Sequence, residues 1–270
     1  MLPLMRFFIV LFCFNCGDFV TRAAESGPLV IVGGGGTPLA VRQLFVKLAG
    51  GKTARIAVLP QASSRKDRGQ SSVKMFSELG AKVFIVELKN QKTARAQLDE
   101  ATAIWFPGGS QAALFDALEK ATLVKPIRVR HARGLPIGGT SAGAAVMSAV
   151  MIPAMPEKPG LRTGNTPTTL GLGLVPGLII DQHFIARRRM NRLLSAVLDH
   201  PEHIGVGIGE ATAIIVRGNH FTVMGKNSVI VIDPRAAKLD KPEKGNLLSA
   251  TGLRLHVLKA GQEFLFGGKK

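Results

Sequence analysis

The sequence predicts an α/β protein with a mostly parallel sheet that helices cover on both faces. Two observations support this: short β-branched runs alternate with segments of helical spacing, and glycine-rich turns follow several of the runs. The chain has 270 residues and 46% hydrophobic content, which is enough to bury a substantial core. Ligands of such sheets bind beyond the carboxyl ends of the strands. The glycine-rich turns at 33–36, 108–109 and 138–139 therefore mark the predicted functional edge.

The first half of the chain is expected to alternate between strand and helix. Strands are predicted at 28–34, 54–60, 81–88, 101–109 and 134–139, and helices at 40–50, 71–80 and 111–121. From about residue 204, a series of short apolar runs predicts extra C-terminal β-hairpins or edge strands that close the same domain. The Pro- and Gly-rich segment 151–177 is long for a structureless connection, which favours a loop lining the active site.

The N-terminus resembles a secretory signal. Arg6 precedes an apolar run that is too short to span a bilayer, and the small-residue stretch TRAAES follows. We therefore expect residues 1–24 to be a signal peptide, residues 25–270 to form a single domain, and the protein to be secreted or periplasmic; a buried N-terminal helix is the alternative. Cys13 and Cys16 both lie in this segment, so the mature chain is expected to contain no Cys-based metal site, disulfide or thiolate nucleophile. Lipid attachment at Cys16 stays an open alternative.

The composition argues against nucleic-acid and dinucleotide binding. The chain carries 35 Lys and Arg against 18 Asp and Glu, a field that attracts acidic substrates. It has no tyrosine, one tryptophan and no basic stretch interleaved with aromatics that could stack bases, so we expect no nucleic-acid partner. Pro38 replaces the third glycine of a dinucleotide-binding fingerprint at 33–36.

The segment GTSAG at 139–143 points to nucleophilic catalysis. Ser141 lies between two glycines at a predicted strand-to-helix junction, which is the pattern of a nucleophile elbow. A side chain at either glycine would clash with the neighbouring strand or helix. The N–H of Ala142, at the start of the helix, can stabilise an oxyanion. An ordinary tight turn is the alternative interpretation.

A serine nucleophile needs a base and a group that orients the base. Among the six histidines, His183 stands out because it lies between a β-branched run and an expected amphipathic helix; the others lie in polar contexts. The orienting acid has three candidates: Asp181, Asp199 and Glu210.

A cluster of arginines follows His183 on the expected helix. Its members, Arg187, Arg189 and Arg192, are spaced to share a face with each other or with His183. Such a cluster can grip a substrate carboxylate through bidentate hydrogen bonds. A solvated basic helix face is the alternative.

Four motifs, in this order and spacing, resemble the cyanophycinase family, which is related to α-aspartyl dipeptidases. They are FPGGSQ (106–111), GGTSAGAAVM (138–147), DQHFIARRRMNRLL (181–194) and GVGIGEATAI (205–214). The resemblance covers nearly the whole chain after the signal. It implies a flavodoxin-like fold of the glutamine-amidotransferase type, and serine-type exopeptidase chemistry without metal or cofactor.

The resemblance also implies a role for individual residues. Ser141 would be the nucleophile, His183 the general base and Glu210 its partner, while Gly109 and Ala142 would form the oxyanion hole. The positions that match the family's substrate pocket are Gln111, Asp181, Gln182, Arg187, Arg189 and Arg192. The implied substrate is cyanophycin, a poly-aspartate chain with arginine on each side-chain carboxyl, which the family degrades to β-Asp-Arg dipeptides.

Two positions depart from the family pattern. Ser110 and Gly209 stand where the family usually has Asp, so two candidate partners for a substrate guanidinium are missing. The specificity for cyanophycin is therefore open, and other aspartyl peptides are an alternative substrate. A catalytically silent secreted protein that binds acidic peptides or polymers is the second hypothesis. The oligomeric state, with a homodimer as one option, is also open.

Overall fold

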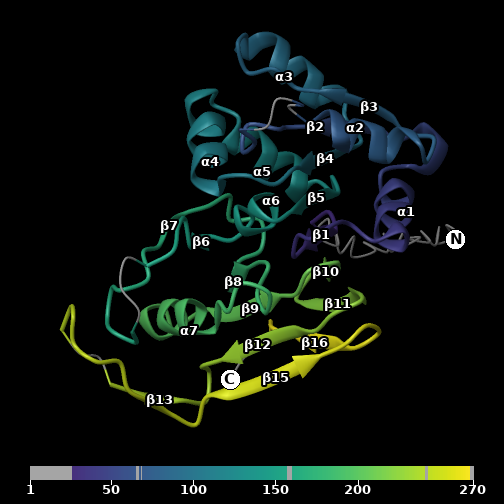
Figure 1. The fold of residues 1–270 in the computed structure, drawn as a ribbon. Coiled ribbons are helices and arrows are strands. Elements are labelled where there is room, and N and C mark those ends of the chain that lie inside the picture. Colours follow the sequence, from purple (N-terminus) through teal and green to yellow (C-terminus); the bar gives the residue numbers. More distant parts are fainter. Residues whose placement is uncertain (1–25, 65–66, 68, 157–159, 241–242, 268–270) are drawn as a thin grey trace, which may run out of the picture.

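The computed structural model describes residues 26–64, 67, 69–156, 160–240 and 243–267, so the expected signal peptide lies outside the described residues. An eight-stranded sheet lies at its centre, in the order β16-β11-β10-β1-β5-β4-β2-β3 (Figure 1). The parallel part consists of β1 (Leu29–Val32), β5 (Ile137–Thr140), β4 (Ala103–Phe106), β2 (Arg55–Val58) and β3 (Lys82–Ile85). The antiparallel part consists of β10 (Thr212–Arg217), β11 (His220–Gly225) and β16 (Glu263–Leu265). The predicted mostly parallel α/β sheet is confirmed.

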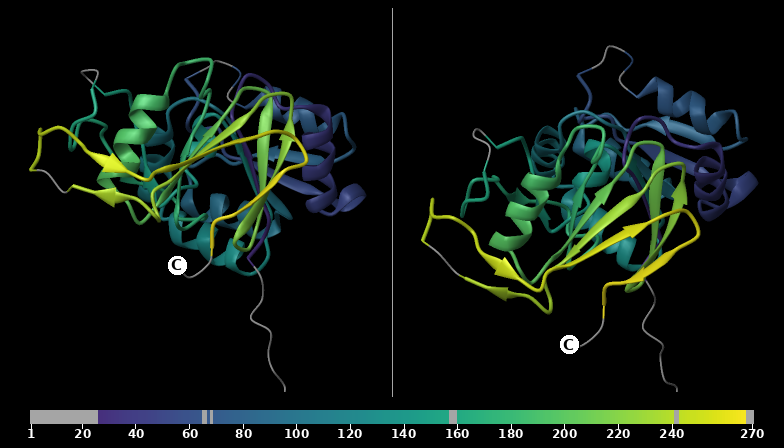
Figure 2. Two further views of the ribbon diagram at one scale, coloured as in Figure 1. Left: turned by 90° about the horizontal axis from the view of Figure 1, so that it is seen from below. Right: turned by 60° about the horizontal axis from the view of Figure 1, so that its bottom comes forward.

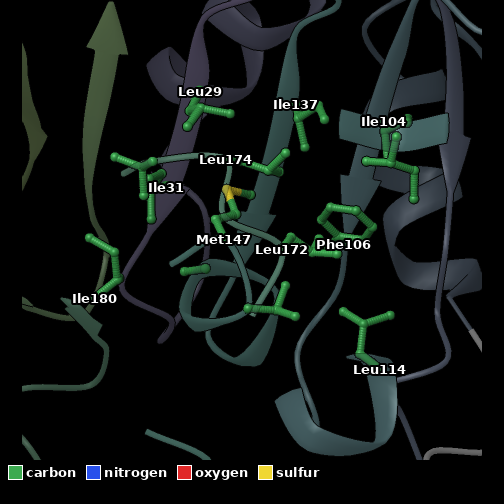
Figure 3. Packing of buried hydrophobic residues seen from close by; sticks show 14 of the residues in the cluster. Leu29, Ile31, Ile104, Phe106, Leu114, Ile137, Met147, Leu172, Leu174 and Ile180 are labelled. Atoms are coloured by element: carbon green, nitrogen blue, oxygen red, sulfur yellow. The ribbon is translucent and has the colours of Figure 1, made fainter. Parts of the chain in front are cut away.

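Helices cover both faces of this sheet because side chains alternate along each strand. Val30 and Val32 of β1 belong to one apolar cluster, which includes residues of α1 (Leu39–Leu48) and α2 (Gln70–Ser77). Leu29 and Ile31 belong to the opposite cluster (Figure 3). That cluster includes residues of α3 (Gln91–Glu100), α4 (Gln111–Lys120) and α5 (Val124–Ala132).

A second, four-stranded sheet extends the C-terminal half of the molecule (Figure 2). Its order is β15 (Arg254–Leu258), β12 (Val229–Asp233), β9 (Ile204–Ile208) and β8 (Leu178–Asp181). Helix α7 (Met190–Asp199) packs on it, and Gly205 leaves room for Leu193 and Val197 of that helix. The C-terminal strands are divided between the two sheets: β10, β11 and β16 join the central sheet, whereas β9, β12 and β15 belong to the second.

Short elements complete the described part of the chain. They are η1 (Gly51–Thr53), α6 (Ala142–Ala145), β6 (Val150–Met151), β7 (Thr169–Leu170), β13 (Lys238–Leu239) and β14 (Ala250–Thr251). β6 and β7 pair near the two ends of the segment expected to be a loop at 151–177. Within the described residues, none of the helices has the length and apolar character needed to cross a membrane.

Three local expectations are corrected by the structure. The helix expected from His183 onward begins only at Met190, because His183 and Arg188 adopt left-handed φ angles of 48° and 51° that a helix cannot contain. Gly138 and Gly139 lie inside β5 rather than in a turn after it. Helices α3 and α5 were not expected; α3 is mostly polar, and α5 carries Pro126 in its first turn, where proline is tolerated.

Candidate active site

Ser141 lies on a strained turn between β5 and α6. Its φ of 55° and ψ of −115° are unfavourable for a residue with a side chain, and such a conformation costs about 1–3 kcal/mol. A Cβ at Gly139 would approach the Gly143 carbonyl to less than 3.0 Å, and a Cβ at Gly143 would approach the Phe106 carbonyl equally closely. The steric reason predicted for the two glycines is confirmed. The turn therefore presents Ser141 at the carboxyl end of the central sheet.

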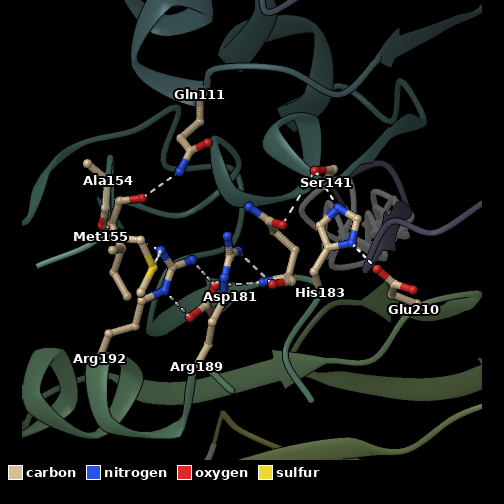
Figure 4. A network of polar contacts seen from close by, with 11 residues as sticks. Gln111, Ser141, Ala154, Met155, Asp181, His183, Arg189, Arg192 and Glu210 are labelled. Atoms are coloured by element: carbon tan, nitrogen blue, oxygen red, sulfur yellow. Dashed lines mark hydrogen bonds and ion pairs between the residues drawn. The ribbon is translucent and has the colours of Figure 1, made fainter. Parts of the chain in front are cut away.

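The structure brings together Ser141, His183 and Glu210 (Figure 4). Ser141 Oγ lies 3.0 Å from His183 Nε2, and His183 Nδ1 lies 2.5 Å from Glu210 Oε1. A carboxylate on Nδ1 favours the tautomer with its proton on Nδ1, which leaves the Nε2 lone pair to accept from the Ser141 hydroxyl. This arrangement can deprotonate the hydroxyl as it attacks an acyl carbon.

The three candidate acids are separated by their contacts. Asp181 is buried and paired with Arg192 and Arg189, and Asp199 accepts from the Gly164 N–H at 2.9 Å. Of the three, Glu210 is the carboxylate that contacts the His183 ring. The choice that the sequence left open therefore falls on Glu210.

The glycine loop after β1 holds His183 and Glu210 in place, a role that was not expected from the sequence. The Gly33 carbonyl accepts from the His183 N–H at 2.7 Å, and the Gly34 carbonyl accepts from the Ala211 N–H at 2.8 Å. A Cβ on Gly34 would lie less than 3.0 Å from the His183 ring, and a Cβ on Gly35 would lie 2.5 Å from the Glu210 side chain. The signal in the sequence was the run of glycines directly after a predicted strand.

His183 lies in an environment that keeps its ring neutral. Burial is the largest influence and lowers the pKa of His183 below its ordinary value. The hydrogen bond and charge of Glu210 oppose this effect, whereas the positive charges of Arg187 and Arg189 add to it. A neutral imidazole is the form that can act as a general base.

The two residues expected to form the oxyanion hole flank Ser141. Gly109 has a φ of 144°, and a Cβ there would overlap the Ala62 carbonyl; its neighbour Gly108 lies against the Ser141 side chain. Ala142 is the first residue of α6, where backbone N–H groups have no intrahelical acceptor. Within the described part of the chain, neither the Gly109 nor the Ala142 N–H has a hydrogen-bond acceptor. Both are thus available to an oxyanion.

The arginines expected to bind substrate are largely occupied by Asp181. Arg192 donates from Nε to Asp181 Oδ2 at 2.7 Å and from Nη2 to Asp181 Oδ1, while its Nη1 contacts the Ala154 carbonyl at 3.4 Å and Met155 Sδ at 3.1 Å. All three nitrogens of Arg192 thus have protein partners. The Arg192 guanidinium is therefore held against Asp181 and the start of the segment 151–177.

Arg189 also pairs with this carboxylate, so that Asp181, Arg189 and Arg192 form one ion cluster, the Asp181 cluster. Its Nη1 donates to Asp181 Oδ1 at 3.3 Å and to the carbonyl of Gln182, the residue before His183, at 2.7 Å. Burial, together with the nearby charge of Arg192, lowers the pKa of Arg189 to about 10. Because the cluster grips the end of β8 and the Gln182 carbonyl, it fixes the backbone that carries His183.

The other three expected substrate-binding residues differ in availability. Gln111 is buried, and its Nε2 donates to the Ile152 carbonyl at 2.7 Å. Gln182 Oε1 lies 3.4 Å from Ser141 Oγ, close enough to border a bound substrate. Arg187 is exposed. The start of the segment 151–177 thus contacts Gln111 through residue 152, and Arg192 through residues 154 and 155.

The two departures from the family pattern have local structural explanations. Ser110 caps α4, because its Oγ accepts from the Ala113 N–H at 3.2 Å, a role that Asp also performs. A Cβ at Gly209 would lie 2.8 Å from the Ser228 carbonyl and 2.9 Å from Asn227 Cβ, so an Asp there would require a shift of that turn. Among the described residues, no three His, Cys, Asp or Glu side chains gather in a way that could hold a metal ion.

The fold and the Ser141, His183 and Glu210 arrangement define the class of α/β serine hydrolases. The model of peptidase family S51 matches residues 29–224. The chain therefore belongs to peptidase family S51 and is a serine-type peptidase, which confirms the resemblance noted in the sequence.

Named relatives cover most of the chain. It is 35% identical to a cyanophycinase of Trichormus variabilis over 90% of this chain and 87% of that protein. It is 36% identical to a cyanophycinase of Geminocystis herdmanii over 83% of this chain and 87% of that protein. A peptidase E of Actinobacillus pleuropneumoniae is 26% identical over 68% of this chain and 80% of that protein.

Two crystal structures share the fold. A peptidase from an acI-B1 actinobacterium has a TM-score of 0.67 and 22% identity, covering 91% of this chain and 99% of its own. A peptidase E protein of Listeria monocytogenes has a TM-score of 0.58 and 18% identity, covering 75% of this chain and 100% of its own. These likenesses support the α/β fold without a closed barrel.

Proposed function

We propose that this protein is an exported serine-type exopeptidase that hydrolyses cyanophycin through an acyl-enzyme and releases β-Asp-Arg dipeptides. The observation that carries the proposal is the continuous contact from Ser141 through His183 to Glu210 on a nucleophile elbow. The choice of substrate rests on relatives that are named cyanophycinase and are 35–36% identical.

In the proposed reaction, Ser141 Oγ attacks the carbonyl carbon of the scissile amide while His183 Nε2 takes the hydroxyl proton. Glu210 holds the Nδ1 proton and stabilises the imidazolium that forms. The N–H groups of Gly109 and Ala142 donate to the oxyanion. The C–N bond breaks as His183 returns the proton to the leaving nitrogen, and water then hydrolyses the ester by the same route.

The substrate would lie beside the side chains of Gln182 and Arg187. Both residues are close to the triad, and neither side chain is paired with Asp181. Four other residues would act indirectly, by holding the walls on this side of the site: Gln111, Asp181, Arg189 and Arg192. With Ser110 and Gly209 in place of Asp, other aspartyl peptides stay an alternative substrate. No metal or cofactor takes part in this mechanism.

The proposed location is outside the cytoplasm, as a secreted or periplasmic protein. Its support is the sequence of residues 1–24, with Arg6, an apolar run and a small-residue site. Mass spectrometry of the N-terminus of the protein recovered from its native cells would test this location. An intact residue 1 on the recovered protein would contradict it.

The test of the activity is incubation of the purified protein with cyanophycin and with α- and β-aspartyl dipeptides, followed by mass spectrometry. Release of β-Asp-Arg is the expected result, and Ser141→Ala serves as the inactive control. Cleavage of dipeptides but not polymer would reassign the substrate. Labelling by a fluorophosphonate separates this proposal from the alternative of a silent binding protein, whose Ser141 would not react.

A further inference from the structure

A pocket that is separate from the Asp181 cluster borders Ser141. It has a volume of about 460 Å³ and opens onto Ser141, His183 and the Gly108–Gly109 turn. The rest of its wall comes from Gly34 to Thr37, from Arg42 of α1, from residues around the start of α2, and from further residues that include Ser64, Trp105 and Thr140. Asp67 is the carboxylate among the lining residues. All six positions expected to bind substrate are described, and none of them lines this pocket. The nucleophile thus lies between two separately built regions.

Arg42 supplies positive charge to this pocket in a form that differs from Arg192. Its Nε donates to the Thr37 carbonyl at 2.5 Å, which holds the guanidinium in place. Its two terminal nitrogens have no hydrogen-bond or ion-pair partner within the described residues. Arg192, in contrast, has a protein partner at every nitrogen. The guanidinium of Arg42 therefore lies in the site, and its two terminal nitrogens can bind a ligand carboxylate.

The chemistry of the proposed substrate provides such a carboxylate in every unit. An arginine joined through its α-amine to an aspartate side chain keeps its own α-carboxyl group free, and this group is ionised at neutral pH. A guanidinium binds a carboxylate through two parallel hydrogen bonds. The hydroxyl groups of Ser64 and Ser71, which also line the pocket, can accept from the guanidinium of the same arginine.

We propose that this pocket is an arginine-group subsite, in which Arg42 binds the free α-carboxylate of the unit next to the scissile bond. The inference rests on the proposed function, because it assumes a substrate with arginine side groups. Since Arg42 and Ser141 line one pocket, a carboxylate held by Arg42 determines which amide bond lies at the hydroxyl. Arg42 is thus a specificity-determining residue.

The test compares two peptides: a two-unit aspartate chain with arginine on each side chain, and the same peptide with its arginine carboxyls converted to amides. Arg42→Gln should raise KM for the acid peptide about ten- to hundred-fold, the range for losing a hydrogen-bonded charge. On the amidated peptide, the effect of the substitution should shrink to about two-fold or less, because no carboxylate is left to lose. Arg42→Lys should restore part of the affinity, since lysine keeps the positive charge but cannot form the two parallel hydrogen bonds.

Lys47→Gln is the matched control, because Lys47 is an exposed cation of the same helix that does not line the pocket. An equal rise in KM for Lys47→Gln would indicate a general charge effect and overturn the subsite. An Arg42→Gln effect of equal size on both peptides would also overturn it.

Failure of the proposed function gives a different result. If the wild type cleaves neither peptide, calorimetric binding of the acid peptide to Ser141→Ala and to Ser141→Ala with Arg42→Gln tests the subsite alone. Binding that weakens at least ten-fold with the second substitution supports the subsite. Equal binding, or no binding to either variant, contradicts it.

Discussion

The two sides of His183 differ in how their charged groups are used. On the triad side, Glu210 and Ser141 point their polar atoms at the ring. On the other side, Asp181, Arg189 and Arg192 point theirs at one another. The first region contains the proposed nucleophile and base. The second pairs one carboxylate with two guanidinium groups, so it keeps a net positive charge, and it holds the backbone that carries His183. The polar residues around His183 thus divide into a proposed reacting group and a supporting group.

The sharpest way to test this division is to remove the nucleophile. Ser141→Ala should reduce turnover by about a million-fold, the range for comparable triads. The free energy of unfolding should change little, because Ser141 Oγ has hydrogen-bond partners only in His183 and Gln182 among the residues that the structure describes. Kinetics on an aspartyl substrate and urea denaturation measure the two effects. Unfolding of this variant would show that the triad side is also a structural support.

Removing Asp181 tests the supporting side. Asp181→Ala leaves two buried guanidinium groups without their carboxylate, and breaking a buried pair costs about 3–5 kcal/mol of stability. The matched control is Asp99→Ala, which breaks the exposed ion pair of Arg95 and Asp99 and should cost less than about 1 kcal/mol. Urea denaturation measures both. A small loss of stability for Asp181→Ala, accompanied by a large rise in KM, would instead assign the cluster to substrate binding.

The sequence predicted the triad side better than the supporting side, for a physical reason. Ser141 and His183 could be identified because a nucleophile elbow and a base need particular residue types at particular junctions. Which carboxylate faces the ring, Asp181 or Glu210, depends on how β8 and β9 are placed, and spacing along the chain does not contain that information. The ion pair between Arg192 and Asp181 likewise depends on the tertiary structure and not on spacing along the chain.

The start of α7 was missed for a related reason. The apolar spacing through Phe184 and Met190 favours a helix, and left-handed residues are not visible in a hydrophobic pattern. The structure uses His183 and Arg188 in that conformation to turn the chain from β8 into α7. Catalytic geometry thus overrides local propensity at the place where the base is presented.

The glycine loop offers a finer test of the triad side. Gly34→Ala places a methyl group against the His183 ring and should lower kcat/KM about a hundred-fold, because a small displacement of a reacting group has effects of that size. Gly80→Ala is the control: its φ of 84° is close to the 92° of Gly34, a Cβ there meets nothing within 4 Å, and Gly80 does not line the pocket beside Ser141. Both variants share the backbone cost, so any additional shift in thermal denaturation of Gly34→Ala measures the contact with the His183 ring. Equal kinetic losses in the two would remove the positioning role of Gly34.

The smallest expected effect concerns the charge of Arg187 on the base. His183 must be neutral to accept the Ser141 proton, and the positive charge of Arg187 disfavours its protonation, which lowers the pKa of His183. Arg187→Gln removes this influence, so the pKa rises and the acidic limb of the kcat/KM profile moves to higher pH. Arg188→Gln should leave the limb in place, because Arg188 is exposed and is not among the charges that shift His183.

Salt separates this electrostatic effect from a change in substrate contact. Arg187 is exposed, so its field on His183 passes partly through water and is screened by ions. Raising the ionic strength should therefore move the wild-type limb toward higher pH and move the Arg187→Gln limb less. A limb that responds equally in both proteins would contradict an electrostatic effect of Arg187 on His183 and would assign Arg187 to contact with the substrate.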